Sequence, residues 1–379
     1  MLDLFLLLMV QMEESPYERE YNKPRVYITM GDPAGIGAEV AVRALSNKEI
    51  YTLCIPILLG SYAVLKDVLH FLPSNLSIKK IESPEEALGQ FGTIDLIDFD
   101  NIRLTDFNYG KPSQITGKAA VEYMEKAFRL ICNDLGTQEV TSAIVSGPVS
   151  GSSLWMAGYS GKNDIEPFIE QSKVQFYFPI ILHDHIRIAH VTDRIDVHQV
   201  TEGLSTERIL TTISQTSLFL EQIGIPEPLI GVAGLNSYSG ESGTPGKEEE
   251  QKILPALRLA KARGFHVEGP ITPEMLVPYV ESKRFDAGIA MQREQGFTAF
   301  RARMKYGRGS NRWNGVHGCC LYLGFPFLLT SVIHGPGYDR AGEGKASEES
   351  MIESILTAAS LAKRQTSTLA TLFRRKLGT

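Results

Sequence analysis

The residues best suited to chemistry lie in a glycine-rich turn, Gly31 to Gly37, which carries the carboxylate of Asp32. A β-rich run precedes the turn and an apolar helical pattern follows it. A strand–turn–helix unit of this kind presents backbone amides and a helix N-terminus, which suit an anion. An equally good interpretation is an ordinary turn whose glycines supply backbone freedom. The glycine spacing is not that of a dinucleotide-binding fingerprint.

Strand and helix patterns alternate along the chain and position this turn and several similar loops. Repeated strand–helix units predict an α/β fold with a largely parallel sheet, in which ligand-binding loops follow the carboxyl ends of strands. The predicted helices span 61–71, 117–135, 205–223, 247–263 and 347–363. The predicted strands span 25–29, 53–59, 93–99, 142–145, 178–182, 187–192, 229–235, 287–291 and 325–332. We expect the strands at 178–182 and 187–192 to form a hairpin, and Ser205 to cap the helix that follows it.

Composition restricts the class of protein. The chain has 379 residues, of which 43% are hydrophobic and 22% charged, enough for two globular domains. A net charge of -6 without a basic run argues against a nucleic-acid partner. The apolar start, 1–10, is too short to span a membrane. Four cysteines without zinc or disulfide spacing indicate a reducing, cytoplasmic location.

Four stretches together resemble one enzyme family, at 31–37, 146–149, 234–249 and 330–346. On these motifs the chain resembles the 4-hydroxythreonine-4-phosphate dehydrogenase family, which has an isocitrate/isopropylmalate dehydrogenase-like fold. The resemblance implies a homodimer of two-domain α/β/α subunits, whose site lies between the domains and uses NAD and a divalent metal. The expected parts are an N-terminal extension (1–22), a nucleotide-side domain (23–147 with 302–379) and a substrate-side domain (148–301).

The positions that match the family's metal-binding histidines carry other residues here. The three motifs read Thr192-Asp193-Arg194, Asn236-Ser237-Tyr238 and Gln292-Arg293-Glu294, so Arg194, Tyr238 and Arg293 replace the imidazoles. A guanidinium has no lone pair to offer a cation. We therefore expect no divalent metal. A fourth family histidine, on the substrate side, corresponds to Lys162.

The cofactor side also departs from the family. The family's lysine, asparagine and arginine near the dinucleotide correspond to Arg301, Cys320 and Leu329. The retained loop with His334 and Asp339 leaves NAD as a possible cofactor. A relocated metal site, at His198 with two neighbouring aspartates, is a further but less favoured alternative.

Three functions remain open. The favoured hypothesis is a metal-independent lyase, decarboxylase or isomerase that binds a small phosphorylated or carboxylated metabolite through a cationic cluster. The alternatives are a NAD-dependent dehydrogenase with an altered metal site and a non-catalytic binding protein. The candidate catalytic residues are Lys162, Asp164, Arg194, Tyr238, Arg293 and Glu294. The candidate substrate-binding residues are Asp32, Ser146, Gly147, Asp193, Asn236 and Glu241, and the candidate cofactor contacts are Arg301, His334 and Asp339.

Overall fold

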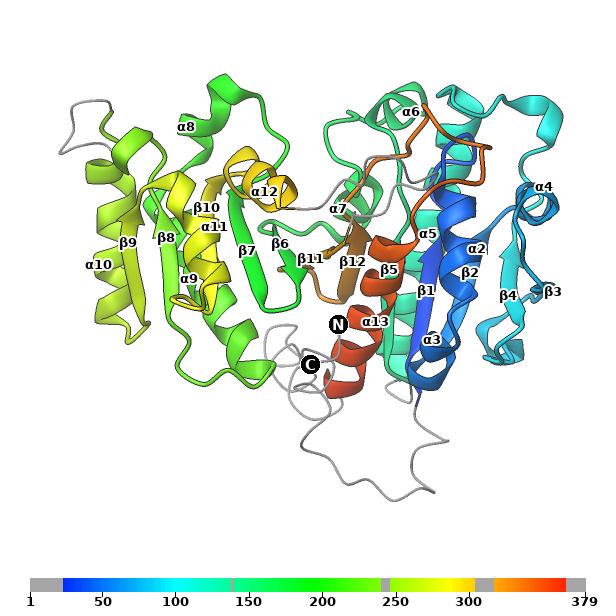
Figure 1. Ribbon diagram of the computed structural model, residues 1–379, viewed down its shortest axis with the longest axis horizontal. Helices are drawn as coiled ribbons and strands as arrows, with labels where there is room; N and C mark the ends of the chain where they lie inside the picture. Colours follow the sequence, from blue (N-terminus) through cyan, green and yellow to red (C-terminus); the bar gives the residue numbers. More distant parts are fainter. Residues whose placement is uncertain (1–22, 138–139, 240–245, 304–316, 366–379) are drawn as a thin grey trace, which may run out of the picture. The chain divides into compact units, whose positions relative to one another are not determined.

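The computed structural model describes residues 23–137, 140–239, 246–303 and 317–365 (Figure 1). The predicted N-terminal extension, 1–22, lies outside the described residues. Within them the chain forms two compact units. The first unit comprises 23–175, 317–319 and 325–365, and the second comprises 176–303 and 320–324. This division assigns 148–175, which the sequence analysis gave to the substrate-side domain, to the first unit.

The first unit contains a parallel sheet with the strand order β3-β4-β2-β1-β5-β12. Helices cover both faces of this sheet, as is usual for parallel sheets. The central strands are therefore buried on both sides, which explains why their sequences are continuous apolar runs. The strands are β1 (Arg25–Thr29), β2 (Ile55–Gly60), β3 (Ser77–Lys80), β4 (Thr93–Asp98), β5 (Ser142–Ser146) and β12 (Leu328–Val332).

Two groups of helices pack on this sheet (Figure 1). One group is α2 (Gly37–Leu45), α3 (Lys48–Leu53), α4 (Tyr62–Phe71) and α13 (Glu349–Gln365), with α13 against β5 and β12. The other is α5 (Gln114–Thr137), which packs on β1, β2 and β5 and carries α6 (Gly151–Met156) and α7 (Glu166–Ser172). The contacts of α6 and α7 with α5 explain why 148–175 belongs to this unit. Two 3-10 turns are η1 (Pro84–Glu86) and η2 (Leu104–Asp106).

The second unit contains a mixed sheet with the strand order β11-β6-β7-β10-β8-β9. The predicted hairpin is confirmed, since β6 pairs antiparallel with β7, whereas β7, β10, β8 and β9 run parallel. The strands are β6 (Phe178–His183), β7 (Ile186–Thr192), β8 (Ile230–Ala233), β9 (Val267–Ile271), β10 (Ala287–Gln292) and β11 (Cys319–Leu323).

The helices of the second unit form two layers, in which α9 packs on α10 and α11 packs on α12. Ser205 caps α9 as predicted, because its hydroxyl accepts from the amide of Arg208. The helix predicted at 247–263 instead opens with a π-helical turn. The elements are η3 (Val197–Gln199), α8 (Val200–Gly203), α9 (Thr206–Gln222), the π-turn η5 (Glu249–Ile253), α10 (Leu254–Ala262), α11 (Pro273–Glu281) and α12 (Arg293–Ala302).

The predicted α/β class with largely parallel strands is confirmed. Across the described parts of the chain, every helix is too short or too polar to cross a bilayer.

Candidate functional site

Three loops of the second unit emerge from one edge of its sheet. The neighbouring parallel strands β7, β10 and β8 end at Thr192, Gln292 and Ala233, and Thr192 is in register with Gln292. The carboxyl ends of such strands are where ligands bind in open α/β sheets. The residues that follow these strands are therefore neighbours, although about 100 residues separate the first loop from the last.

An ion pair joins two of these loops. Arg293 Nη1 donates to Asp193 Oδ1 at 2.9 Å, and the two side chains are 19% and 4% exposed. The guanidinium carbon lies 3.5 Å from the ring centroid of Phe297, one turn along α12. A carboxylate at one edge and an aromatic face below hold the cation in one orientation. Both charged residues were predicted site residues, whereas Phe297 was not predicted.

A buried histidine lies beside this cation. His190 of β7 is fully buried, and its ring centroid is 5.5 Å from that of Phe297. Gly296 leaves room for the imidazole, since a Cβ there would fall 2.3 Å from Nε2. Burial, with a further effect of Arg293, lowers the pKa of His190 to about 3. The imidazole is therefore neutral at physiological pH.

The third loop is fixed by a buried glutamate from the π-turn. Glu249 is 2% exposed, and its Oε1 accepts from the amides of Leu235 and Asn236, each at 2.8 Å. Asn236 Nδ2 donates to Glu248 and Glu249, both at 2.9 Å. The side-chain nitrogen of Asn236, a predicted substrate-binding residue, therefore helps to hold the loop against the π-turn. π-turns often occur at functional sites, and this one brings Glu249 to the loop.

Gln295 links the second loop to the third. Its Oε1 accepts from the amides of Met291 and Gln292, while its Nε2 donates to the carbonyls of Gly234 and Leu235 at 3.0 and 3.2 Å. This side chain was not predicted to matter. The only signal in the sequence is a glutamine three residues after Gln292, which is the spacing of a capping box.

The other candidate residues of the second unit differ in exposure. Arg194 and Tyr238 adopt left-handed backbone conformations, with φ of 49° and 50°. Tyr238 is 67% exposed, and Glu294 is exposed in the first turn of α12. Arg301 lies in the last turn of the same helix. Glu241 lies outside the described residues.

In the first unit, backbone amides of the glycine-rich turn donate hydrogen bonds to other groups of the protein. The amides of Asp32, Gly35 and Ile36 donate to backbone carbonyls, and that of Ala34 donates to Asp32 Oδ1. A Cβ on Gly31 would lie 2.4 Å from the carbonyl oxygen of Pro148. These contacts favour the interpretation of an ordinary, tightly packed turn over an anion-binding one.

Asp32 is also held by a residue far along the chain. Its carboxylate is fully buried, and Tyr338 donates to Oδ2 at 2.7 Å. The same phenol lies 2.9 Å from Ser153 Oγ. Burial and the nearby Asp32 carboxylate raise the pKa of Tyr338, so the phenol remains a donor. Tyr338 lies in the family-like stretch 330–346, but the sequence did not predict it as a partner of Asp32.

The remaining candidates of the first unit lie at the end of β5 and in the connection between α6 and α7. Ser146 is buried, and the Gly147 amide donates to Thr29 Oγ1 at 3.0 Å. Lys162 is exposed and Asp164 is buried. Because both belong to the first unit, their predicted meeting with Arg194, Tyr238 and Arg293 of the second unit stays a prediction.

The two predicted cofactor contacts of this unit have local partners. His334 Nδ1 lies 2.9 Å from the carbonyl oxygen of Gly335. Asp339 forms an ion pair with Arg340 at 2.6 Å, and this hydrogen bond lowers the pKa of the carboxyl. Their predicted role toward NAD stays a prediction.

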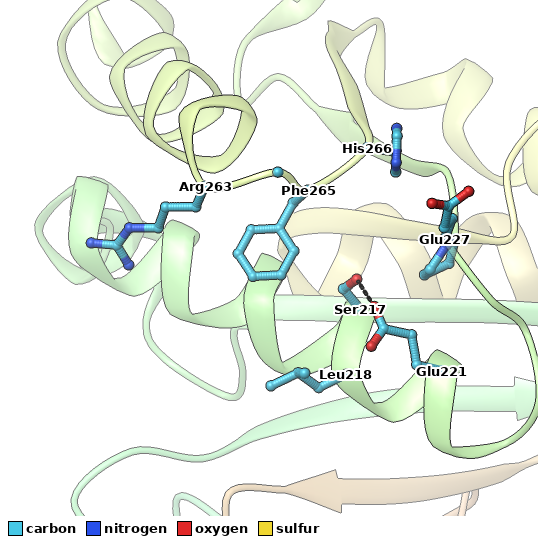
Figure 2. A pocket seen from close by; sticks show the side chains of 9 residues that line it. Ser217, Leu218, Glu221, Glu227, Arg263, Phe265 and His266 are labelled. Carbon is cyan, nitrogen blue, oxygen red and sulfur yellow. Dashed lines mark hydrogen bonds between the residues drawn. The ribbon is translucent and has the colours of Figure 1, made fainter.

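A small pocket lies at the opposite end of the second unit's strands (Figure 2). It has a volume of about 270 Å³ and is bounded by the end of α9 and by the loops that lead into β8 and β9. Figure 2 shows Glu221, which accepts a hydrogen bond from Ser217, on the same side of the Phe265 ring as Glu227 and His266. None of the predicted site residues lines it.

Comparison with known proteins places the chain in a family. The sequence profile described as "Pyridoxal phosphate biosynthetic protein PdxA" matches residues 52–358. The chain belongs to the PdxA family. It is 32% identical over 338 residues to a Clostridium botulinum protein provisionally named D-threonate 4-phosphate dehydrogenase, covering 89% of this chain and 97% of that protein. It is also 32% identical to the 4-hydroxythreonine-4-phosphate dehydrogenase of Desulforapulum autotrophicum, covering 89% and 95%.

Solved structures of PdxA-family proteins are also similar to this chain. A 4-hydroxythreonine-4-phosphate dehydrogenase from Burkholderia phymatum matches with a TM-score of 0.69 and 31% identity, covering 89% of this chain and 98% of that chain. The enzyme from Klebsiella pneumoniae gives a TM-score of 0.74 at 28% identity, covering 89% and 99%. The predicted family membership is therefore confirmed.

A divalent metal does not fit the side chains at the corresponding positions of this PdxA-family chain. Arg194 and Arg293 offer no lone pair, and Arg293 already neutralises the nearby carboxylate of Asp193. In the described ranges, no three histidine, cysteine, aspartate or glutamate side chains are grouped so as to hold a metal ion.

Proposed function

We propose that this PdxA-family chain is an enzyme that acts on a small phosphorylated or carboxylated metabolite without a divalent metal ion. The observation that carries the proposal is the Asp193–Arg293 ion pair at the carboxyl ends of β7 and β10. By the motif resemblance, this fixed cation takes the place of a metal-binding histidine of the family. The compounds in the relatives' names, D-threonate 4-phosphate and 4-hydroxythreonine-4-phosphate, carry both a carboxylate and a phosphate. They indicate the class of substrate.

The cations have separate tasks in this proposal. Arg194 and Arg293 bind the carboxylate or phosphate through paired N–H groups, for which the planar guanidinium is suited. Lys162 supplies a further positive charge, and the exposed Tyr238 hydroxyl donates a hydrogen bond or a proton. Fixed cations stabilise negative charge that develops on a substrate oxygen, which is one role of a metal ion. Decarboxylase, lyase and isomerase reactions use such stabilisation. We propose a homodimer as the working assembly.

The test measures ligand binding with and without metal. The purified chain is treated with EDTA, and its melting temperature is recorded with phosphate, small phosphorylated acids and NAD. The phosphorylated acids should raise the melting temperature equally before and after EDTA. Arg194→Ala should abolish the shift, while the control Arg263→Ala, on the far side of the unit, should retain it.

Three results would change the proposal. A shift or turnover that requires zinc or magnesium would contradict metal independence. Tight binding of NAD together with a metal would favour the dehydrogenase alternative. No response to any anion, and no turnover, would favour a non-catalytic binding protein.

A further inference from the structure

The small pocket beside the starts of β8 and β9 has one apolar wall and one acidic wall. Its volume of about 270 Å³ lies just below the roughly 300 Å³ at which pockets for drug-sized ligands begin. Phe265 and Leu218 line it with apolar surface. Figure 2 shows the carboxylates of Glu221 and Glu227 on the same side of the Phe265 ring. The pocket therefore suits a small molecule that has a charged end and a carbon chain.

Two helices end at this pocket, and the same motif fixes both ends. After α9, the amide of Ile225 donates to the carbonyl of Leu220 at 2.9 Å, and after α10 the amide of Phe265 donates to the carbonyl of Ala260 at 3.1 Å. A glycine in a left-handed conformation precedes each of these amides. This is the Schellman arrangement, which closes a helix with backbone hydrogen bonds. The walls of the pocket are therefore formed before any ligand arrives.

The negative charge at the pocket has no counter-charge in the described part of the chain. Glu221 lies in the last turn of α9, which contains no basic residue. A helix C-terminus carries partial negative charge, so it disfavours a carboxylate there and favours a cation. Ser217 donates to Glu221 at 3.3 Å but leaves its charge in place. Among the described residues, neither Glu221 nor Glu227 forms an ion pair, and Figure 2 shows the Arg263 guanidinium pointing away from both.

The loop between α9 and β8 fixes the position of Glu227. Its backbone has a φ of 50°, in the left-handed region that residues with a side chain rarely adopt. The buried Pro228 follows, and the amide of Leu229 donates to Asp286 Oδ2 at 2.8 Å. The carboxylate of Glu227 therefore projects from an anchored part of the chain.

We propose that this pocket binds a small organic ammonium ion, whose nitrogen lies between Glu221 and Glu227 and whose carbon chain packs on Phe265. An ammonium group offers N–H donors to both carboxylates, and an aromatic face attracts a cation. The two carboxylates and the two helix C-termini would repel an anion. A metal ion does not fit, since no three metal-binding side chains are grouped together in the described ranges. This second site is independent of the proposed function.

Saturation-transfer NMR on the full chain, with butylammonium as the probe, tests the proposal. The pocket also contains His266, and pH 8 is chosen because a histidine with the ordinary pKa of about 6.5 is uncharged there. Butylammonium should bind saturably with a dissociation constant of roughly 1 mM, because partly exposed ion pairs and cation–π contacts are individually weak. The neutral 1-butanol, which has the same chain length, should bind at least about tenfold more weakly.

Variants assign the binding to this pocket. Glu221→Gln combined with Glu227→Gln removes both charges and should weaken butylammonium binding roughly tenfold. Glu202→Gln combined with Glu207→Gln, at exposed positions near the start of α9, changes the net charge equally and should bind like the wild type. This control tests for general attraction of a cation to a chain with a net charge of -6. Phe265→Leu keeps an apolar side chain without the ring and should weaken binding roughly threefold.

Three results would overturn the proposal. They are the absence of saturable binding up to twenty times the expected dissociation constant, equal affinities for butylammonium and 1-butanol, and equal losses in the two double variants. None of them bears on the proposed function, because neither Asp193 nor Arg293 lines this pocket.

Discussion

Arg293 donates to Asp193 across 100 positions of sequence, and the carboxylate that receives this hydrogen bond is almost completely buried. Each residue comes directly after the end of its own strand, and the two strands are parallel neighbours. The pair therefore forms because β7 and β10 are neighbours in the sheet. It gives the second unit a fixed, partly neutralised cation at the carboxyl edge of its parallel strands.

Breaking the ion pair from one side should be costly, whereas removing both charges should not. Asp193→Leu leaves Arg293 partly buried without a counter-charge, and we expect a loss of roughly 3 kcal/mol in the free energy of unfolding. The double variant Asp193→Leu with Arg293→Leu should recover most of that loss. Urea unfolding of the wild type, Asp193→Leu and the double variant gives the three free energies of unfolding to compare.

The control for this prediction is the exposed pair of Arg284 and Glu268, whose side chains are 53% and 48% exposed. Glu268→Leu should change stability by less than about 1 kcal/mol. A double variant at the buried pair that is no more stable than Asp193→Leu would contradict the explanation.

Removing the Tyr338 hydroxyl should destabilise the first unit. Tyr338→Phe leaves Asp32 Oδ2 buried without its donor, and the expected cost is roughly 1–3 kcal/mol. Thermal unfolding should show a lower midpoint for Tyr338→Phe. Ser153→Ala, which removes a contact of the phenol and keeps the Asp32 bond, should cost less. Equal stability of Tyr338→Phe and the wild type would show that Asp32 does not depend on this donor.

Loss of the Glu249 carboxylate should loosen the loop after β8. Glu249 accepts from the amides of Leu235 and Asn236, so Glu249→Ala should make both amides exchange faster with solvent. Hydrogen exchange followed by mass spectrometry reports this on a peptide containing Leu235 and Asn236. Glu250→Ala, at the exposed neighbouring position, is the matched control and should leave their exchange unchanged.

Acid should destabilise the chain partly through His190. The pKa of this residue falls from its ordinary value of 6.5 to about 3 in the folded chain, so unfolding takes up a proton between these two pH values. Stability from this group is therefore present above pH 6.5 and is lost as the pH falls toward 3, by at most about 1.4 kcal/mol per pH unit.

The variant His190→Leu should lack this contribution. Urea unfolding at several pH values should give it a shallower decline of stability below pH 6.5 than the wild type has. His266→Asn, at an exposed histidine, should keep the wild-type slope. Parallel slopes for His190→Leu and the wild type would refute the prediction.

The sequence by itself determined the local structure and the family. Apolar periodicity, the Ser205 cap and the turn between β6 and β7 act over a few residues, so they predicted the α/β class, the hairpin and most helices. The family motifs are likewise continuous in the sequence. Together they identified Asp193 and Arg293 as residues of interest, but not as partners.

Only the tertiary structure decided which distant groups meet. The bonds of Asp193 to Arg293 and of Asp32 to Tyr338 join residues 100 and 306 positions apart. Such contacts depend on strand order, which sequence periodicity does not encode. The π-turn at Glu249 was hidden for a similar reason, because a helix that bulges has nearly the same apolar pattern as one that does not. The glycine-rich turn was undecided between anion binding and packing until its amides were seen to bond within the protein.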